Sequence, residues 1–322
     1  MILLVAPPDD RHAAAVADRL RARGEDAALI DVASLTAQLT IGLEFAPGLS
    51  ASGSVQVHGL DGATTQTIDL SRVTAGWWRR SWIPLLGADD PRLTGAPVDF
   101  GEALVSTAEA LDIAWANEPV AVDLAQRRTR LWASARRAGL IMPHTIVTHD
   151  PGAAHRFAKQ HLRTGVVCRP LVKSHAEWPA QDRIMGVSAI DELVEQNGPD
   201  LVLRAFVPGS DLRAFVAGDR VLAADLGPTA TNDPGAGLLP VVPSGARAVE
   251  LPVEVRDGLA ALVADLGLGH AAVDLRRTRA GEHLFLDLDP LAGWLDVEAV
   301  TGLPLTEQLV DELLARSAAR VA

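Results

Sequence analysis

The chain has 322 residues, a formal net charge of −12 and 48% hydrophobic residues, so it can form two or three packed lobes and carries no overall positive charge that would attract nucleic acid. Its single cysteine, Cys168, excludes an internal disulfide and a cysteine-cluster zinc site. No apolar run approaches a membrane span, and the first residues indicate a strand rather than a signal peptide, so we expect a cytoplasmic protein.

The first part of the sequence predicts a small parallel α/β lobe. An apolar strand at 1–5 precedes a helix with apolar residues at helical spacing over 11–23, and a second strand follows at 27–31. The glycines here do not follow the pattern G-x-G-x-x-G, which argues against a nicotinamide site. Alternating segments at 53–58 and 65–70 predict a β-hairpin inserted in this lobe.

The middle and the end of the sequence alternate strand and helix patterns. A loop rich in Gly, Pro and Thr is expected at 229–245. The expected strands lie at 74–80, 112–115, 145–148, 165–170, 200–206, 211–215, 221–226, 270–276 and 283–288. The expected helices span 100–111, 122–138, 150–161, 192–196, 253–266 and 306–316.

Three aspartates lie on the last two predicted strands. Asp287 and Asp289 are two residues apart, so their side chains face the same side of the sheet, and Asp274 lies on the adjacent antiparallel strand. Carboxylates gathered on one patch repel unless a cation neutralises them, and hard oxygen ligands suit Mg²⁺, which also bridges nucleotide phosphates. The alternative is a solvent-exposed acidic strand pair, which the flanking Val, Leu and Phe residues disfavour.

Arg213 lies on the predicted strand 211–215 between apolar neighbours. An arginine in that setting is costly without an anionic partner, and a phosphate group would satisfy it with paired hydrogen bonds. The alternative is an ordinary surface ion pair between Asp211 and Arg213.

Several short motifs follow one another along nearly the whole chain. They are Trp77-Trp78-Arg79-Arg80, Trp115-Ala116-Asn117-Glu118-Pro119, the segment 138–151, Ser210-Asp211-Leu212-Arg213, Gly218-Asp219-Arg220-Val221, Gly293-Trp294-Leu295 and Thr301-Gly302-Leu303-Pro304. In order and spacing they resemble the ATP-grasp superfamily, and within it the ligases that macrocyclise ribosomally made peptides (graspetide or microviridin-type maturases).

The resemblance implies an α/β protein with α+β lobes, the ATP-grasp fold preceded by a Rossmann-like lobe. The N-terminal pre-ATP-grasp lobe is then expected at 1–118, the central ATP-grasp lobe at 119–204 and the C-terminal lobe with the metal site at 205–322. ATP would lie between the last two lobes. The implied partner is a precursor peptide with leader and core segments, and no nucleic acid or membrane is expected. The resemblance also suggests a homodimer, although nothing in the residues derives one.

The same resemblance implies the site. Mg²⁺ on Asp274, Asp287 and Asp289 would bridge the phosphates of ATP, while Arg213 and Arg276 would stabilise the transferring phosphate. A substrate carboxylate would be phosphorylated, and a hydroxyl or amine would attack the acyl phosphate to give an ester or an amide. The residues implied for nucleotide binding are Arg169, Lys173, Arg204, Phe206, Val207 and Arg213.

Several positions depart from the family pattern. Arg169 stands where a lysine is usual, another arginine replaces a lysine near 127–130, and Lys173 is either a substitute phosphate ligand or an exposed loop lysine. The hinge has Arg204-Ala205-Phe206 in place of Gln-Glu-Phe. The last metal strand has Asp287-Leu288-Asp289 in place of Glu-x-Asn, and an Asp-Trp-Arg segment is not apparent in the expected loop.

Two further functions stay open, and the replacements favour the first of them. One is a degenerate ATP-grasp protein that binds a peptide or a partner ligase without catalysis. The other is an ATP-grasp ligase that acts on a small amino acid or peptide.

Overall fold

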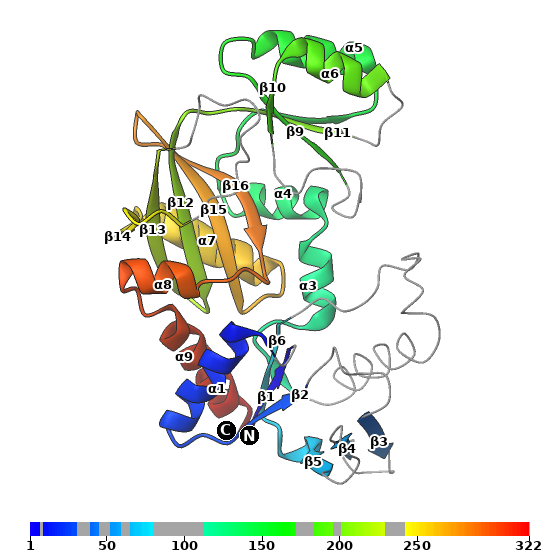
Figure 1. Ribbon diagram of the computed structural model, residues 1–322, viewed down its shortest axis with the longest axis vertical. Helices are drawn as coiled ribbons and strands as arrows, with labels where there is room; N and C mark the ends of the chain where they lie inside the picture. The colour runs from blue at the N-terminus through cyan, green and yellow to red at the C-terminus, as the bar shows by residue number, and fades with distance from the viewer. Residues whose placement is uncertain are drawn as a thin grey trace.

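The computed structural model describes residues 1–6, 9–30, 39–44, 52–58, 65–79, 113–171, 183–195, 201–228 and 242–321 (Figure 1). Within these ranges the strands form four sheets, one in the middle of the chain, one near its end and two in its first part. Three of the predicted features lie wholly or mostly outside the described residues. They are the helix expected at 100–111, residues 229–241 of the loop expected at 229–245, and Lys173.

The first lobe has a parallel sheet with strand order β2-β1-β6-β7. Its first helix buries Ala13, Val16 and Leu20 at helical spacing, and the side chain of Asp10 caps its N-terminus. The parallel β-α-β start predicted from the sequence is therefore confirmed. The elements are β1 (Ile2–Val5), α1 (Arg11–Ala22), β2 (Ala27–Ile30), β6 (Ala75–Trp78) and β7 (Ala114–Trp115).

The insertion in this lobe has one strand more than the predicted hairpin. Val55 pairs with Ile68 in the expected way, and a third strand pairs with the free side of the first. The antiparallel order is β3-β4-β5. The elements are β3 (Leu39–Glu44), β4 (Ser52–His58), β5 (Thr65–Asp69) and the short 3₁₀ helix η1 (Leu70–Arg72).

The prediction of a single helix over 122–138 is wrong, because two helices occupy this part of the chain. They are α3 (Pro119–Ala125) and α4 (Arg128–Arg137), and Arg127 between them is extended, with φ −75° and ψ 104°. The break turns the chain so that Arg128, the first residue of α4, reaches the carbonyl of Leu171 with its Nε at 3.2 Å. This contact between segments distant in sequence is not visible in the helical pattern.

The central lobe is an antiparallel sheet with strand order β10-β9-β11-β8, covered on one face by two helices (Figure 1). Phe157 of the first helix and Ile190 of the second are buried against the strands. The second helix begins earlier than the predicted 192–196. The elements are β8 (Thr145–Thr148), α5 (Pro151–Gln160), β9 (Val166–Pro170), β10 (Arg183–Met185), α6 (Val187–Glu195) and β11 (Leu201–Ala205).

The last lobe is an antiparallel sheet with strand order β14-β13-β12-β15-β16. α7 packs on one of its faces, and α9 returns to pack against α1 and β6 of the first lobe (Figure 1). The elements are β12 (Gly209–Ala217), β13 (Arg220–Pro228), β14 (Arg247–Val249), α7 (Val253–Asp265), β15 (His270–Thr278), β16 (His283–Asp289), α8 (Leu295–Thr301) and α9 (Leu305–Val321). In the ranges given above, no helix is long and apolar enough to cross a lipid bilayer.

Gly209 opens β12 directly after the connection between the two last lobes. A Cβ at this position would lie 2.2 Å from the carbonyl oxygen of Arg277 on the neighbouring strand. We expect Gly209→Ala to lower the free energy of unfolding by about 1–3 kcal/mol, because the two backbones must separate. Urea unfolding measures this. The matched control is Gly245→Ala, whose Cβ meets nothing within 4 Å, and equal effects of the two changes would contradict the prediction.

Candidate functional site

Two identical Asp-Leu-Arg tripeptides, at 211–213 on β12 and 274–276 on β15, face each other in the C-terminal sheet. The strands are antiparallel, and the register sets the aspartate of each tripeptide opposite the arginine of the other. The two central leucines point to the opposite face, into the core beneath α7. The sheet therefore carries two reciprocal ion pairs on one face.

The pair between Arg213 and Asp274 is bidentate. Arg213 donates from Nε to Oδ1 of Asp274 at 2.8 Å and from Nη2 to Oδ2 at 3.2 Å. Burial opposes the charged form of Arg213, yet its pKa is raised, because the charge and hydrogen bonds of Asp274 favour the guanidinium, with further support from Asp289 and Asp211. The alternative of a surface pair between Asp211 and Arg213 is wrong, because each of them pairs with a residue of β15 instead.

The third strand adds its carboxylates to the same face. Asp287 lies opposite Asp274, so Arg213, Asp274 and Asp287 form one row across β12, β15 and β16. The ladder between β15 and β16 shifts just beyond this row, which leaves Leu286 without a partner on β15. Asp289 is exposed, and its Oδ1 accepts from the backbone N–H of Leu291 at 2.9 Å.

Three arginines of the central lobe reach this row. Arg169 on β9 donates from Nη1 to Oδ2 of Asp287 at 3.0 Å, and Nη1 of Arg128 lies 3.6 Å from the same oxygen. Arg204 on β11 donates from Nη1 to the carbonyl of Leu286 at 2.9 Å. Arg169 therefore lies beside Asp287, at the junction of the central and C-terminal lobes.

Arg276 takes a different position from the one expected for a phosphate contact. Its side chain is buried, donates to Asp211 and to the carbonyl of Val207, and stacks over the ring of Phe206 with 5.3 Å from Cζ to the ring centroid. Phe206 and Val207 form the connection between the two lobes. These contacts favour a role for Arg276 in holding that connection.

The carboxylates suit Mg²⁺ by their chemistry, since Asp274 and Asp287 offer hard oxygen ligands on the same face. Both are held by arginines, through Arg213 and Arg169. Within the described part of the chain, no group of three or more His, Cys, Asp or Glu side chains is arranged to hold a metal ion. The carboxylates that would hold a metal here are therefore already paired with arginines.

Asn117 ties the carboxylate strands together, and the sequence marked it only as part of a motif. The side chain is fully buried. Its Oδ1 accepts from the N–H groups of Gly269 and His270, both at 3.0 Å, and its Nδ2 donates to the carbonyls of His270 at 2.8 Å and Pro290 at 3.1 Å. Asn117 thus joins the start of β15 to the end of β16.

The segment after the last carboxylate is also held by the first lobe. Arg79 donates to the carbonyl of Leu291 and lies over the ring of Trp294, with 5.9 Å from Cζ to the ring centroid. Nε2 of His12 accepts from the backbone N–H of Trp294 at 3.0 Å. These buried contacts between distant motifs fix where β16 ends relative to the first lobe.

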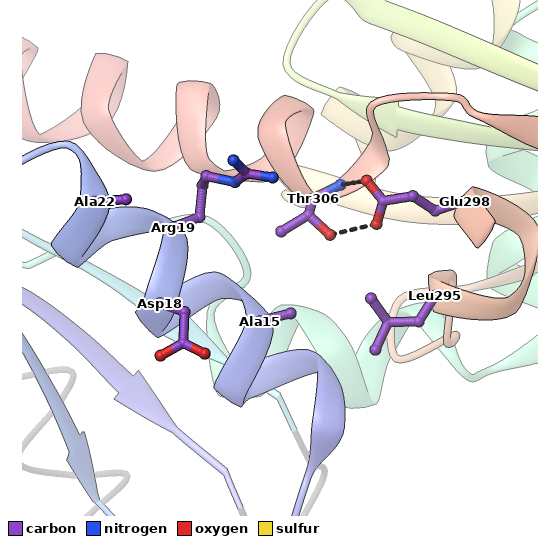
Figure 2. A pocket seen from close by; sticks show the side chains of 7 residues that line it. All are labelled: Ala15, Asp18, Arg19, Ala22, Leu295, Glu298 and Thr306. Atoms are coloured by element: carbon purple, nitrogen blue, oxygen red, sulfur yellow. Dashed lines mark hydrogen bonds between the residues drawn. The ribbon is translucent and has the colours of Figure 1, made fainter.

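A separate pocket of about 440 Å³ lies between α1 and the helices α8 and α9 (Figure 2). In its wall, both carboxylate oxygens of Glu298 accept hydrogen bonds from Thr306, at the start of α9. None of the predicted site residues lines it. Its lining residues are Ala15, Asp18, Arg19, Ala22, Leu295, Glu298 and Thr306.

Sequence relatives are distant. No protein-family model matches the chain. A probable alpha-L-glutamate ligase 2 of Shewanella amazonensis is 25% identical over 243 residues, which cover 74% of this chain and 79% of the relative. A probable alpha-L-glutamate ligase of Legionella pneumophila is 23% identical over 236 residues, which cover 71% of this chain and 76% of that relative.

Solved structures match the whole chain. A RiPP-associated ATP-grasp ligase of Chryseobacterium gregarium, in complex with ADP and a leader and core peptide, superposes with a TM-score of 0.80 at 15% identity, covering 98% of this chain and 96% of that one. The chain has the ATP-grasp fold. The macrocyclase MdnC of Microcystis aeruginosa, bound with precursor peptide MdnA, gives a TM-score of 0.76 at 18% identity, and the match covers 98% of this chain and 100% of MdnC. The ATP-grasp fold predicted from the sequence motifs is confirmed.

Proposed function

We propose that this chain is an ATP-dependent carboxylate ligase that acts on a ribosomally made precursor peptide and forms ester or amide links. The observation that carries the proposal is the row Arg213, Asp274 and Asp287, which faces Arg169 and Arg128 of the central lobe. It joins cationic phosphate ligands to oxygen donors at the junction of the two lobes. Two structural neighbours support the choice of substrate, a macrocyclase bound with a precursor peptide and an ATP-grasp ligase in complex with a leader and core peptide.

The chemistry needs two steps. A carboxylate oxygen of the peptide attacks the γ-phosphorus of ATP, the bond from that phosphorus to the bridging oxygen breaks, and ADP leaves. A hydroxyl or amine of the same peptide then attacks the carbonyl carbon of the acyl phosphate, loses its proton and displaces phosphate. The chain needs to orient these groups and to neutralise charge on the transferring phosphate.

The residues divide between these tasks. Bound Mg²⁺ would neutralise the phosphate oxygens, with Asp274, Asp287 and Asp289 as the proposed ligands. Arg213 would contact the transferring phosphate. Arg169, Arg204 and Lys173 are proposed for nucleotide phosphates, and Phe206 and Val207 for the nucleotide at the connection between the lobes. The contacts of Arg276 support a role in positioning that connection.

Two other functions have some support. The glutamate ligases among the sequence relatives favour an amino acid or short peptide as substrate. The arginine partners of Asp274 and Asp287 favour a protein that binds a peptide or a partner ligase without catalysis. We propose a cytoplasmic location for each of the three, and a homodimer by the family resemblance.

Magnesium-dependent nucleotide binding tests the proposal. We expect ADP, or a non-hydrolysable ATP analogue, to bind in isothermal titration calorimetry and to bind at least about tenfold more tightly with Mg²⁺ than with EDTA. Asp274→Asn should remove that magnesium dependence, because the change removes a proposed anionic ligand. Asp219→Asn is the matched control, since Asp219 is exposed at the turn between β12 and β13.

Two other results of these binding and turnover measurements would each favour one of the two alternative functions. Absence of binding at millimolar nucleotide, with and without a candidate precursor peptide, would contradict the ligase and favour the non-catalytic protein. Nucleotide binding together with turnover of free glutamate in place of a peptide would favour the amino acid ligase.

A further inference from the structure

Three arginines of the central lobe converge on two consecutive residues of β16. Arg169 and Arg128 share one carboxylate oxygen, Oδ2 of Asp287, at 3.0 and 3.6 Å. Arg204 donates to the carbonyl of the preceding Leu286 at 2.9 Å. They come from β9, α4 and β11, so these contacts join the two lobes between which nucleotide is proposed to bind.

These charged side chains lie largely away from bulk water. The side chains of Arg128 and Arg169 are 7% and 9% exposed, and that of Asp287 is 21% exposed. A guanidinium removed from water requires an anion close by, and carboxylate and phosphate oxygens are both anions that a guanidinium binds. Asp287 supplies that anion from within the chain.

We propose that Asp287 is an internal placeholder for a nucleotide phosphate. Its carboxylate holds Arg128 and Arg169 until a phosphate takes its place on the two arginines, and is then released to the metal. This inference rests on the proposed function and deepens it, because it gives Asp287 two opposite effects. The carboxylate supports binding of a phosphate that arrives with Mg²⁺ and competes with a phosphate that arrives without it.

The competition predicts a gain of affinity from an amide. Asp287→Asn keeps the size of the side chain but removes its charge, so a metal-free anion no longer has to displace a carboxylate. We expect inorganic tripolyphosphate, titrated in EDTA by calorimetry, to bind this variant roughly tenfold or more tightly than the wild type. The variant should at the same time lose the enhancement of ADP binding by Mg²⁺.

Asp289→Asn is the matched control for this gain. It makes the same chemical change two residues further along β16, on an exposed side chain whose Oδ1 accepts from the backbone N–H of Leu291. Its gain in tripolyphosphate affinity should be clearly smaller. Equal gains in the two variants would mean that any loss of negative charge on β16 raises tripolyphosphate affinity, and this would overturn the placeholder.

A second variant tests the exchange by changing an arginine partner of Asp287 instead of the carboxylate. It also provides a test if Asp287→Asn does not fold. Arg169→Gln removes one partner and leaves the carboxylate in place, so Mn²⁺ alone should bind more tightly than in the wild type, as measured by the loss of the free Mn²⁺ signal in electron paramagnetic resonance. Unchanged or weaker Mn²⁺ binding would overturn the inference.

The outcomes separate this inference from the proposed function. If the wild type binds no nucleotide with Mg²⁺ but Asp287→Asn gains tripolyphosphate affinity, the ligase proposal fails, and what remains of the inference is the competition between Asp287 and a phosphate for the two arginines. If the wild type binds nucleotide with Mg²⁺ and Asp287→Asn shows no gain in EDTA, the placeholder falls and the ligase proposal stands.

Discussion

Replacing Arg213 by glutamine is expected to lower the rate of the proposed peptide-dependent ADP release by roughly 10²- to 10³-fold. This is the usual effect of removing one donor aimed at charge that develops in the transition state, the role proposed for Arg213. Arg213 lies in the same row as Asp274 and Asp287, and its side chain is 16% exposed, so bulk water does not replace it. A coupled assay of ADP release at saturating ATP measures the rate, and calorimetry measures ADP affinity. We expect the rate to change far more than the affinity.

Two control variants show whether the lower rate of Arg213→Gln is specific to the guanidinium at this position. Arg220→Gln removes an arginine that is exposed beyond the turn of the same hairpin, where it donates to Asp311 at 2.6 Å, and should leave the rate within about twofold, as for other exposed ion pairs. Arg213→Lys keeps the charge but loses the planar fork, so it should restore only part of the rate. A rate for Arg213→Gln within about tenfold of the wild type would rule out a phosphate contact in the transition state.

Replacing Asn117 by alanine is expected to lower the free energy of unfolding by about 3–5 kcal/mol, because four hydrogen bonds are lost and the backbone groups that made them stay buried. Urea unfolding followed by tryptophan fluorescence measures the change. The loss should extend to the site, since Asn117 joins His270 at the start of β15 to Pro290, which follows Asp289.

Asn117→Asp separates the two halves of this network. It keeps an acceptor for the N–H groups of Gly269 and His270, but removes both donated bonds and sets a charge against two carbonyls. It should therefore be destabilised as well. Gln160→Ala, at an exposed end of α5, should change stability by less than about 0.5 kcal/mol. A loss below about 1 kcal/mol for Asn117→Ala would mean that water replaces the side chain.

Local patterns were sufficient for most of the strands and helices. The period of two along 283–288 predicted that Asp287 and Asp289 share a face, and the structure extends the strand by one residue to Asp289. Helical spacing predicted α1 and α7 to within two residues. The pattern failed at 122–138, where Arg127 breaks the helix although no proline or glycine marks the break.

The sequence named candidate residues for the site but did not predict how their side chains pair. The sequence marked Arg213 and Asp274 for a phosphate and a metal, yet these side chains hold each other. It also marked Arg276 for the transferring phosphate, whereas the buried side chain contacts Asp211 and Val207. Lys173 lies outside the described residues, so its role stays a prediction.

The sequence by itself determined which carboxylates share a sheet face, because that follows from the period of two along neighbouring strands. Its motifs, by their order and spacing along nearly the whole chain, carried the resemblance that predicted the ATP-grasp fold. Only the tertiary structure decided which charges meet. Arg128 and Arg169 come from elements far from Asp287 along the chain, and a guanidinium selects its partner by distance and burial after the lobes have packed. The spacing of residues along the sequence does not predict how the lobes pack, so it could not predict these ion pairs.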